Sequence, residues 1–362
     1  MCDVSTIVGR IGFRGYTTQD IVEEGKGAIA LSPTNIVSNK LTYEKDNTYI
    51  SFHKYEESPE IMIHQGDVIF VKTGSTVGKV AYVGELICKT TLNPQVVVLK
   101  NILCDNYLLS VIMSTQKFQS KIRKITVGGA VPTLSQVAMG NIFISLPKAE
   151  EQIKLSKFIA LLDERIATQS KIIEDLKKLK SAISHILFSS KGAIHLSEIA
   201  NVVMGQSPSS NAYNDQGLGM PLVQGNLDIS NGKTTPRLYT AEFNQTTEKG
   251  NIILTVRAPV GEVAKATQKV CLGRGVCAII PHEENMSDFI YQYLTFYKFM
   301  WRRYEQGSTF TSINGSDVRN IFCPKVRNVS ILTLLDIKIN IEERVVKQYQ
   351  SQKQYMLYQM FI

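Results

Sequence analysis

The sequence repeats itself, and this self-similarity constrains the fold more than any other feature of the chain. The segment GDVIFVKTGSTVGKVA, from Gly66 to Ala81, returns as GNIILTVRAPVGEVA from Gly250 to Ala264. A second string, GGAVPTLSQVAMGNIF from residue 128 to 143, matches GSTFTSINGSDVRNIF from residue 307 to 322 without a gap. The period is about 180 residues, which indicates two copies of one unit.

Each copy has the pattern of a mixed, largely β domain. β-branched and apolar residues precede a short turn and the motif Val-Gly-x-Val-Ala, which predicts a hairpin whose glycine, Gly78 or Gly261, permits a tight bend. A helix-like stretch follows in each copy, at Asn106–Lys124 and Ser287–Arg303, and its last turn carries two basic residues. We therefore expect a domain of roughly 130 to 150 residues in each half.

A segment of a different kind follows each domain. From residue 149 to 188, apolar side chains recur alternately four and three residues apart, with polar interruptions at Gln169 and Lys180. This spacing is typical of a coiled-coil seam, here made of Leu155, Ile159, Leu162, Ile166, Ile173, Leu176, Ile183 and Leu187. The C-terminal segment repeats the pattern, with a seam of Leu335, Ile339, Val346, Tyr349, Met356 and Met360. At about 1.5 Å per residue, each helix forms a rod of roughly 50 Å.

These patterns predict an α+β protein with a pseudo-twofold internal repeat. The two domains occupy residues 1–147 and 191–325, and the helical segments occupy residues 148–190 and 326–362. We expect the two long helices to pair as an antiparallel coiled coil, which separates and joins the domains.

Composition excludes several classes of protein. Hydrophobic residues make up 44% of the chain and no apolar run reaches 18 residues, so a folded protein without a membrane span is expected, in the cytoplasm. Six scattered cysteines form no CxxC pair and are expected to be small core residues. Forty Lys and Arg against 32 Asp and Glu give a net charge of +8, which favours an anionic partner without requiring one.

Motifs for catalysis are missing from the sequence. The best phosphate-loop candidate, from Gly74 to Val80, has three residues between its glycines and lacks the Ser or Thr that binds magnesium. Asn93-Pro94-Gln95 lacks the second proline and the aromatic ring of an amino-methyltransferase motif. No HExxH, GxSxG or GxGxxG motif occurs. The sequence therefore favours a recognition or scaffold protein without a catalytic site, a metal or a bound cofactor.

Several short strings together carry a family resemblance that covers nearly the whole chain. They are Leu146-Pro147 followed by Glu151-Gln152-Ile153, Leu161-Leu162-Asp163 through Leu187-Phe188, Gly205-Gln206-Ser207-Pro208-Ser209, and the paired strings Gly66-Asp67-Val68-Ile69 and Gly250-Asn251-Ile252-Ile253. With these strings the chain resembles the specificity subunit of type I restriction-modification enzymes.

The resemblance implies a function in DNA recognition. Each target-recognition domain would read one half of a bipartite double-stranded DNA site. The helices would dock two modification (methyltransferase) subunits and, through them, restriction subunits. S-adenosylmethionine and ATP would be bound by those partners and not by this chain.

Candidate DNA contacts follow from side-chain chemistry at repeated loop positions. Base readout needs polar or basic side chains on loops, whereas phosphates are neutralised by basic residues. For base readout we select Arg10, Arg14, Lys72, Thr73, Gln206, Ser207, Gln224, Asn226 and Arg257. For phosphate contact we select the repeated basic pairs Arg123, Lys124, Arg302 and Arg303, although a basic last turn also suits a helix C-terminus.

Two other interpretations stay open at this point. In the first, the chain is a bivalent scaffold whose domains bind protein and do not read DNA. In the second, it is an enzyme whose site is built from unfamiliar residues. Salt dependence separates DNA binding from apolar protein binding, because contacts to several phosphates weaken steeply as ionic strength rises.

Overall fold

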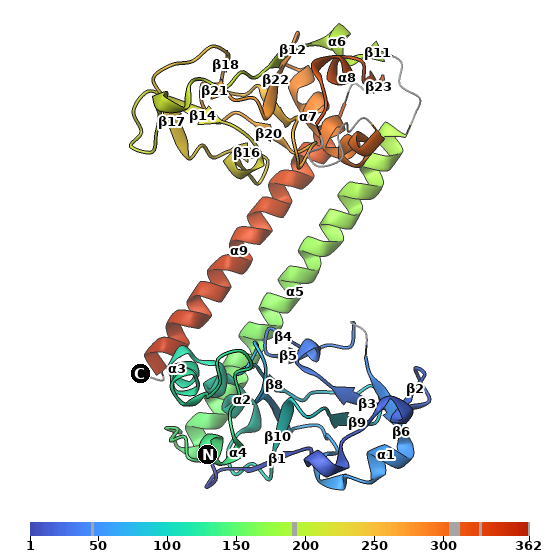
Figure 1. The fold of residues 1–362 in the computed structure, drawn as a ribbon, viewed down its shortest axis with the longest axis vertical. Coiled ribbons are helices and arrows are strands. Elements are labelled where there is room, and N and C mark those ends of the chain that lie inside the picture. Colours follow the sequence, from blue (N-terminus) through green and yellow to red (C-terminus); the bar gives the residue numbers. More distant parts are fainter. Residues whose placement is uncertain (45–46, 190–193, 304–311, 326–327, 361–362) are drawn as a thin grey trace. The chain divides into compact units, whose positions relative to one another are not determined.

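The computed structural model describes residues 1–44, 47–189, 194–303, 312–325 and 328–360 (Figure 1). Contacts group the chain into two units, Met1–Thr168 with Val346–Ile362, and Gln169–Val345. Each unit contains one domain and part of each of two long helices. The expected boundaries at 190/191 and 325/326 adjoin residues outside the described ranges, and residues 307–311 of the second repeated string also lie outside them.

The first domain is built on two sheets. Its six-stranded sheet has the order β1-β10-β7-β8-β5-β4, with β1 (Thr6–Gly9), β10 (Val96–Lys100), β7 (Val68–Val71), β8 (Val80–Tyr82), β5 (Lys40–Leu41) and β4 (Ile36–Val37). Its four-stranded sheet has the order β2-β6-β3-β9, with β2 (Ile21–Val22), β6 (Tyr49–Ser51), β3 (Gly27–Leu31) and β9 (Thr90–Leu92). Strand β7 is buried at every position, which explains its continuous apolar sequence.

The second domain repeats this topology. Its six-stranded sheet has the order β12-β22-β19-β20-β16-β15, with β12 (Ala200–Met204), β22 (Val276–Pro281), β19 (Ile252–Thr255), β20 (Val263–Lys265), β16 (Lys233–Thr234) and β15 (Ile229–Ser230). Its other sheet, β13-β17-β14-β21-β18, has five strands: β13 (Tyr213–Asn214), β17 (Leu238–Thr240), β14 (Met220–Val223), β21 (Val270–Leu272) and β18 (Thr246–Thr247). A further pair joins β11 (Ile194–His195) to β23 (Phe322–Cys323). The two-domain repeat expected from the sequence is confirmed.

Parallel pairing occurs at equivalent places in both domains. In the first domain β5 runs parallel to β8 and β3 runs parallel to β9. In the second domain β16 runs parallel to β20 and β14 runs parallel to β21. The remaining strand pairs of these sheets are antiparallel, so the duplicated sequence encodes a duplicated mixed fold.

The repeated glycines lie where the backbone needs them. The hairpins β7–β8 and β19–β20 contain Gly78 at φ +99° and Gly261 at φ +90°. Gly66 and Gly250, which open the repeated strings, have φ values of +92° and +90°. Residues with a Cβ rarely adopt this region, so the predicted tight bends are confirmed.

The short helices differ in one respect from the sequence expectation. They are α1 (Phe52–Glu56), α2 (Asn106–Ser114), α3 (Gln116–Ile125), α4 (Gln136–Gly140), α6 (Leu196–Ile199), α7 (Met286–Tyr297) and α8 (Gly315–Arg319). The single helix expected over 106–124 is two helices, because Thr115 is extended at ψ 151° and its side chain caps α3 by accepting from the N–H of Phe118. In the second domain, α7 continues into a 3-10 turn, Lys298–Arg303.

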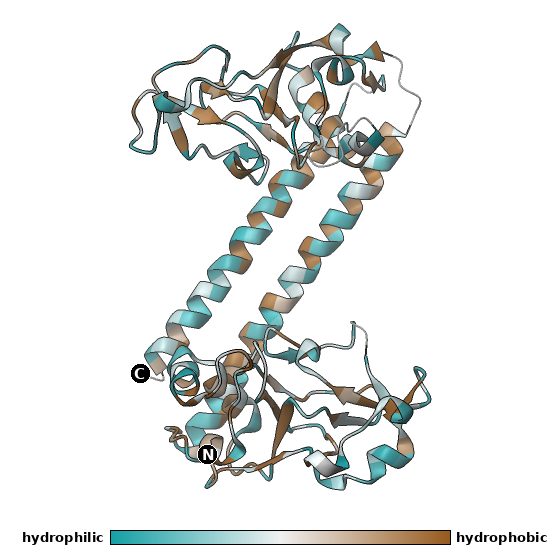
Figure 2. Cartoon of the chain, in the orientation of Figure 1, coloured by the Kyte–Doolittle hydropathy of each residue, from teal (hydrophilic) through white to brown (hydrophobic). Residues whose placement is uncertain are grey.

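Two long helices, α5 (Ala149–Phe188) and α9 (Ser330–Met360), carry the predicted seams. Figure 2 shows brown apolar bands recurring along both helices between teal polar ones. Every predicted seam residue of α5 is buried or half-buried, and so are those of α9 except Met360, which is 38% exposed. No helix within the described residues is long and apolar enough to cross a membrane.

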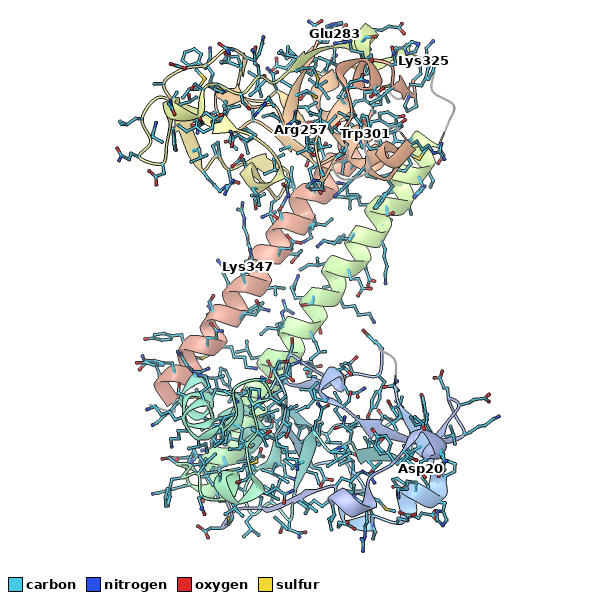
Figure 3. The ribbon with its side chains drawn as sticks, in the orientation of Figure 1. Asp20, Arg257, Glu283, Trp301, Lys325 and Lys347 are labelled. Carbon is cyan, nitrogen blue, oxygen red and sulfur yellow. The ribbon has the colours of Figure 1, made fainter. Side chains whose placement is uncertain are left out.

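Aromatic side chains form much of the core of the second unit. Phe188, the last residue of α5, is buried with ring centroids 6.2 Å from Phe289 and 5.4 Å from Tyr293. Trp301 is fully buried in the same cluster (Figure 3). It is the single tryptophan of the sequence, so its fluorescence reports on the second domain.

Replacing Gly261 by Ala tests the packing of this core. A Cβ at Gly261 would lie 2.4 Å from Cδ1 of Trp301, whereas a Cβ at Gly250 would have nothing within 4 Å. Both glycines have a φ of +90°. We expect G250A to lower the free energy of unfolding by about 1 kcal/mol through backbone strain, and G261A by about 3 kcal/mol through strain and overpacking.

The measurement is urea unfolding followed by the fluorescence of Trp301. G250A is the matched control, because it isolates the backbone contribution at the same φ. Equal losses of stability in the two variants would show that contact with Trp301 contributes nothing.

Candidate nucleic-acid interface

In the second domain, one short turn joins three loops. Residues Gly273–Gly275, between β21 and β22, form this turn. The N–H of Gly273 donates to the carbonyl of Val223 at 2.8 Å, and the Gly275 carbonyl accepts from the N–H of Val256 at 2.9 Å. The N–H of Arg274 donates to Oγ of Ser207 at 3.0 Å. These bonds bring together the loops that carry Ser207, Gln224 and Arg257.

The turn leaves little room for side chains at its two glycines. A Cβ at Gly275 would lie 2.0 Å from the Gln224 carbonyl oxygen, and one at Gly273 would lie 3.0 Å from Cγ of Gln224. Arg274, between them, is exposed. The backbone therefore presents the Arg274 side chain outward while the flanking glycines pack against the neighbouring loop.

The first domain has the same turn with different residues. Asn93–Gln95 occupies the equivalent place between β9 and β10. The N–H of Asn93 donates to the Leu31 carbonyl at 2.9 Å, and the Gln95 carbonyl accepts from the N–H groups of Lys72 at 2.9 Å and Thr73 at 3.3 Å. Gly74 in turn donates to the Pro132 carbonyl at 2.9 Å. The scaffold of backbone hydrogen bonds recurs, but the side chains on it do not.

Arg10 is buried, contrary to the prediction that it reads DNA bases. It is only 5% exposed, and its guanidinium is used inside the domain. Nε donates to the Leu92 carbonyl at 2.8 Å, and Nη2 donates to Oγ1 of Thr91 at 3.1 Å. In the second domain the equivalent carbonyl, that of Leu272, is bonded by the backbone N–H of Gln206 at 2.9 Å. Arg10 thus supplies a scaffold bond and is not positioned to contact bases.

The environment of Arg10 agrees with a structural role. Its guanidinium lies 5.4 Å from the ring centroid of Tyr16, and Nη1 donates to the Arg14 carbonyl at 3.2 Å. Burial, the largest influence, lowers the pKa of Arg10 from its ordinary value, and the neighbouring Tyr16 opposes this.

The other predicted readers differ in exposure. Gln206 and Arg257 are exposed, and Figure 3 labels Arg257. Half-buried positions are Arg14, Lys72, Thr73, Ser207, Gln224 and Asn226. Arg14 lies beside Glu60, with Nη1 3.5 Å from Oε1. Arg274 was missed by the sequence analysis, although the flanking glycines of Gly273-Arg274-Gly275 at a strand end were a usable signal of an exposed turn.

The basic pairs belong to helical segments and not to these loops. Arg123 and Lys124 are exposed on the last turn of α3. Arg123 donates to Oγ of Ser120 at 3.0 Å and lines a groove of about 1030 Å³ with Tyr355 and Tyr358 of α9. Arg303 is exposed, whereas the side chain of Arg302 lies outside the described part of the chain.

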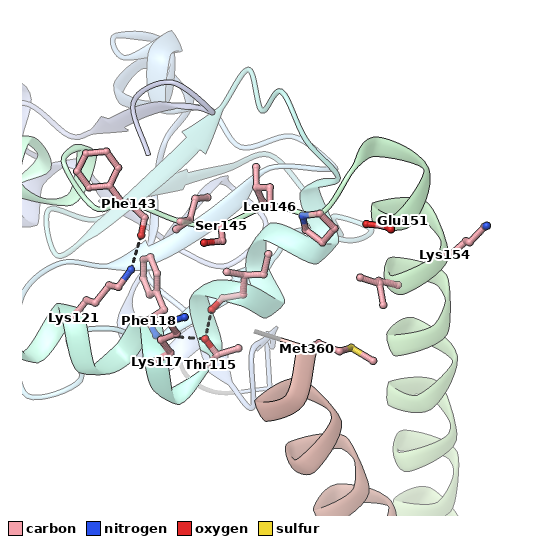
Figure 4. A pocket seen from close by; sticks show the side chains of 14 residues that line it. Thr115, Lys117, Phe118, Lys121, Phe143, Ser145, Leu146, Glu151, Lys154 and Met360 are labelled. Carbon is pink, nitrogen blue, oxygen red and sulfur yellow. Dashed lines mark hydrogen bonds between the residues drawn. The ribbon is translucent and has the colours of Figure 1, made fainter. Parts of the chain in front are cut away.

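A second groove of the first unit, of about 600 Å³, lies between α3, α5 and the end of α9 (Figure 4). Ile112, Phe118, Leu155 and Met360 give it an apolar lining, and Nζ of Lys121 donates to the Phe143 carbonyl at 2.7 Å at its edge. This lining suits apolar side chains better than phosphates.

Among the residues that the structure describes, no group of three or more His, Cys, Asp or Glu is arranged to hold a metal ion. Burial raises the pKa of the Cys277 and Cys323 thiols to about 12, so both remain protonated and unreactive. Together with Cys271 they are buried core residues, as the sequence suggested, and Cys88 and Cys104 are half-buried against the core, but Cys2 is exposed, so the prediction was wrong for Cys2.

Comparisons with known proteins point to one family. The model of the type I restriction modification DNA specificity domain matches residues 16–178 and again residues 192–348. The proposed MjaX type I restriction enzyme specificity subunit of Methanocaldococcus jannaschii is 30% identical over 327 residues, which cover 81% of this chain and 74% of that protein.

Solved structures share the fold. The S subunit of a type I restriction-modification system from M. genitalium matches 100% of this chain and 94% of its own length, with a TM-score of 0.64 and 18% identity. A chain solved in work on assembly and conformational transition of the type I R-M system matches with a TM-score of 0.58 and 22% identity, over 99% of this chain and 97% of that one. With two matching domains across most of its length, the chain belongs to the family of type I restriction-modification DNA specificity subunits.

Proposed function

We propose that each domain reads one half of a two-part DNA target and that the two half-sites differ. The observation that carries this proposal is the recurring turn at Asn93–Gln95 and Gly273–Gly275, which holds equivalent loops by equivalent backbone bonds. The residues at equivalent positions differ, since half-buried Lys72 and Thr73 in the first domain correspond to buried Val256 and exposed Arg257 in the second. A common scaffold with different side chains suits two readers of different sequences.

The chemistry of the second domain favours readout in a DNA groove. Arg257 and Arg274 are exposed on two loops joined at Gly275, and Gln206 is exposed on a third. Arginine can form two hydrogen bonds with the edge of a guanine, and glutamine can form two with the edge of an adenine. The exposed residues that do not meet bases would neutralise phosphates.

The long helices are proposed to form an antiparallel coiled coil that spaces the two readers. In the second unit, Nζ of Lys177 lies 2.7 Å from Glu343, and Nζ of Lys180 lies 2.6 Å from Asp336. Residue numbers rise along α5 as they fall along α9, which is the pattern of antiparallel neighbours. At about 1.5 Å per residue, a helix of the length of α5 spans roughly 60 Å and would set a fixed gap between the half-sites.

The outer face of α5 is proposed to dock the modification subunits. Beyond the seam, Ile172, Leu179 and Ile186 are 41%, 49% and 79% exposed at intervals of seven residues. On α9, Leu334 and Ile341 are 63% and 48% exposed and lie seven residues apart. Exposed apolar stripes of this kind mark protein interfaces. Two modification (methyltransferase) subunits would bind there, and restriction subunits would join through them.

The chain is proposed to act without catalysis of its own. S-adenosylmethionine and ATP would be bound by the partner subunits. The alternative, a bivalent protein-binding scaffold, has apolar surface in its favour, namely the groove lined by Ile112, Phe118 and Leu155. The recurring loop scaffold with exposed arginines favours DNA.

Co-expression with a modification subunit of the same source tests the proposal. We expect the complex to methylate adenines within one two-part motif of fixed gap, detected by sequencing the modified DNA. An unmethylated genome together with a stable complex would count against DNA readout. The absence of any complex would make the protein-binding scaffold the better explanation.

Salt titration tests the exposed arginines. In the assembled complex, R257A and R274A should each reduce the slope of log affinity against log salt by about one where the side chain contacts a phosphate. Where the side chain contacts a base, the slope should be unchanged, and the second half-site of the motif should tolerate other bases at that position. The control is K178A, because Lys178 is exposed on α5 and paired with Glu174. Variants that change neither slope nor motif would exclude both arginines from the interface.

Replacement of Arg10 should lower the stability of the first domain, because its side chain bonds groups inside that domain. R10M removes the donors to the Leu92 carbonyl and the Thr91 hydroxyl, so the first domain should lose about 1–3 kcal/mol of unfolding free energy. Urea unfolding followed by circular dichroism measures this loss, while the fluorescence of Trp301 in the second domain serves as an internal control. An R10M protein of unchanged stability would contradict the scaffold role.

A further inference from the structure

A half-buried carboxylate joins three helices in the first unit. Oδ1 of Asp163 on α5 lies 2.5 Å from Nζ of Lys353 on α9. Oδ2 of the same residue accepts a hydrogen bond from the Tyr107 hydroxyl on α2 at 2.6 Å. The side chains of Asp163 and Lys353 are only 20% and 21% exposed. We call these three residues the Asp163 cluster.

The second unit contains the same arrangement. Oδ1 of Asp336 on α9 lies 2.6 Å from Nζ of Lys180 on α5, and Oδ2 accepts from Nε2 of Gln292 on α7 at 2.7 Å. The side chains of Lys180 and Asp336 are 18% and 31% exposed. These residues form the Asp336 cluster.

The internal repeat relates the two clusters. Asp163 corresponds to Asp336 and Lys180 corresponds to Lys353, both at the constant offset of the matched helical segments. In both clusters lysine bonds Oδ1 and a neutral donor from the domain helix bonds Oδ2. The neutral donor has changed between tyrosine and glutamine, but the geometry has not.

The Tyr107 hydroxyl is suited to this role. Burial, followed by the hydrogen bond to Asp163, raises the pKa of Tyr107 far above its ordinary value, so the hydroxyl remains a donor. Each carboxylate is thereby paired with one charge and one neutral hydrogen bond.

The surrounding residues make this pairing selective. Ile159, one turn before Asp163, is 2% exposed and packs in an apolar cluster with Leu108, Leu155 and Leu357. A slip of one helical turn between α5 and α9 would bring the Lys353 ammonium opposite Ile159 and leave Asp163 without its partner. An unpaired half-buried charge is costly, so polar pairs inside an apolar seam specify one register.

We propose that the Asp163 and Asp336 clusters set the register of α5 against α9 and the seating of each domain helix on them, and thereby fix the number of base pairs between the half-sites. The role in fixing the gap rests on the proposed function. The helix register is a property of the protein alone and is tested separately.

The first experiment follows amide hydrogen exchange in the full chain. In D163K, two lysines face one another, and we expect exchange to rise by about tenfold or more in residues 156–167 of α5 and 346–357 of α9. Exchange in the Asp336 cluster should stay within about twofold of the wild type. The charge swap D163K/K353D should recover slow exchange, and Y107F should give a smaller rise near Asp163.

The control is E174K, which breaks the pair of Glu174 with Lys178 on α5, where the side chains are 63% and 69% exposed. It should exchange like the wild type. A D163K protein with wild-type exchange, or a charge swap that recovers nothing, would overturn the register role whatever happens with DNA.

The second experiment sequences the DNA methylated by each variant in complex with the modification subunit. We expect the complex with D163K to methylate motifs that contain both half-sites but have several neighbouring gap lengths. The complex with the charge swap should again methylate a motif of one gap length. A single unchanged gap in D163K, together with fast exchange, would overturn the link to the gap. A wild-type complex without any two-part motif, together with the expected exchange, would leave the register role supported and would refute the proposed function instead.

Discussion

Burial of one apolar stripe along each long helix is the constraint on which both units depend. A stripe with alternating steps of four and three residues stays out of water only against a matching surface. In the first unit, Ile159 and Leu155 of α5 pack with Leu357 of α9 and with Leu108 of α2. In the second unit, Phe188 of α5 packs with Phe289 of α7. Each large apolar side chain buried in this way contributes about 1.5–3 kcal/mol, and the domain helix shares in the same packing.

Polar residues complete this packing where the sequence shows interruptions. Gln169 donates to the Glu342 carboxylate, and Lys180 pairs with Asp336. Such positions appear as breaks in an apolar pattern, yet each interruption meets a complementary group on the other helix of its unit. Each domain adds a donor of its own, since Tyr107 donates to Asp163 in the first unit and Gln292 donates to Asp336 in the second. Helix pairing and domain seating are thus parts of one hydrogen-bonded system.

Features that depend on local or periodic patterns could be predicted from the sequence, whereas features set by long-range partners could not. The duplicated hairpins and Gly78 and Gly261 followed from short strings, and the half-buried seam positions followed from their spacing. Arg10 did not, because its role depends on a carbonyl 82 residues away. The break at Thr115 was missed because a threonine in a helical pattern is compatible both with a continuous helix and with the N-cap of a new one. The glycines beside Arg274 indicate an exposed turn, but that this turn joins the loops of Ser207 and Arg257 depends on contacts that exist only in the fold.

The turn at Gly273–Gly275 has a consequence for how such a protein changes during evolution. Its loops are joined mainly through main-chain groups, which remain when a neighbouring side chain is exchanged. Variation at Arg257 or Arg274 therefore leaves the supporting bonds in place, and under the proposed readout a new DNA preference would arise at little cost in stability. Each domain also has one supporting bond made by a side chain, that of Arg10 in the first domain and that of Ser207 in the second. Exchange of Arg10 or Ser207 would alter the scaffold itself, so these two positions are less free to diverge than the residues that the turns expose.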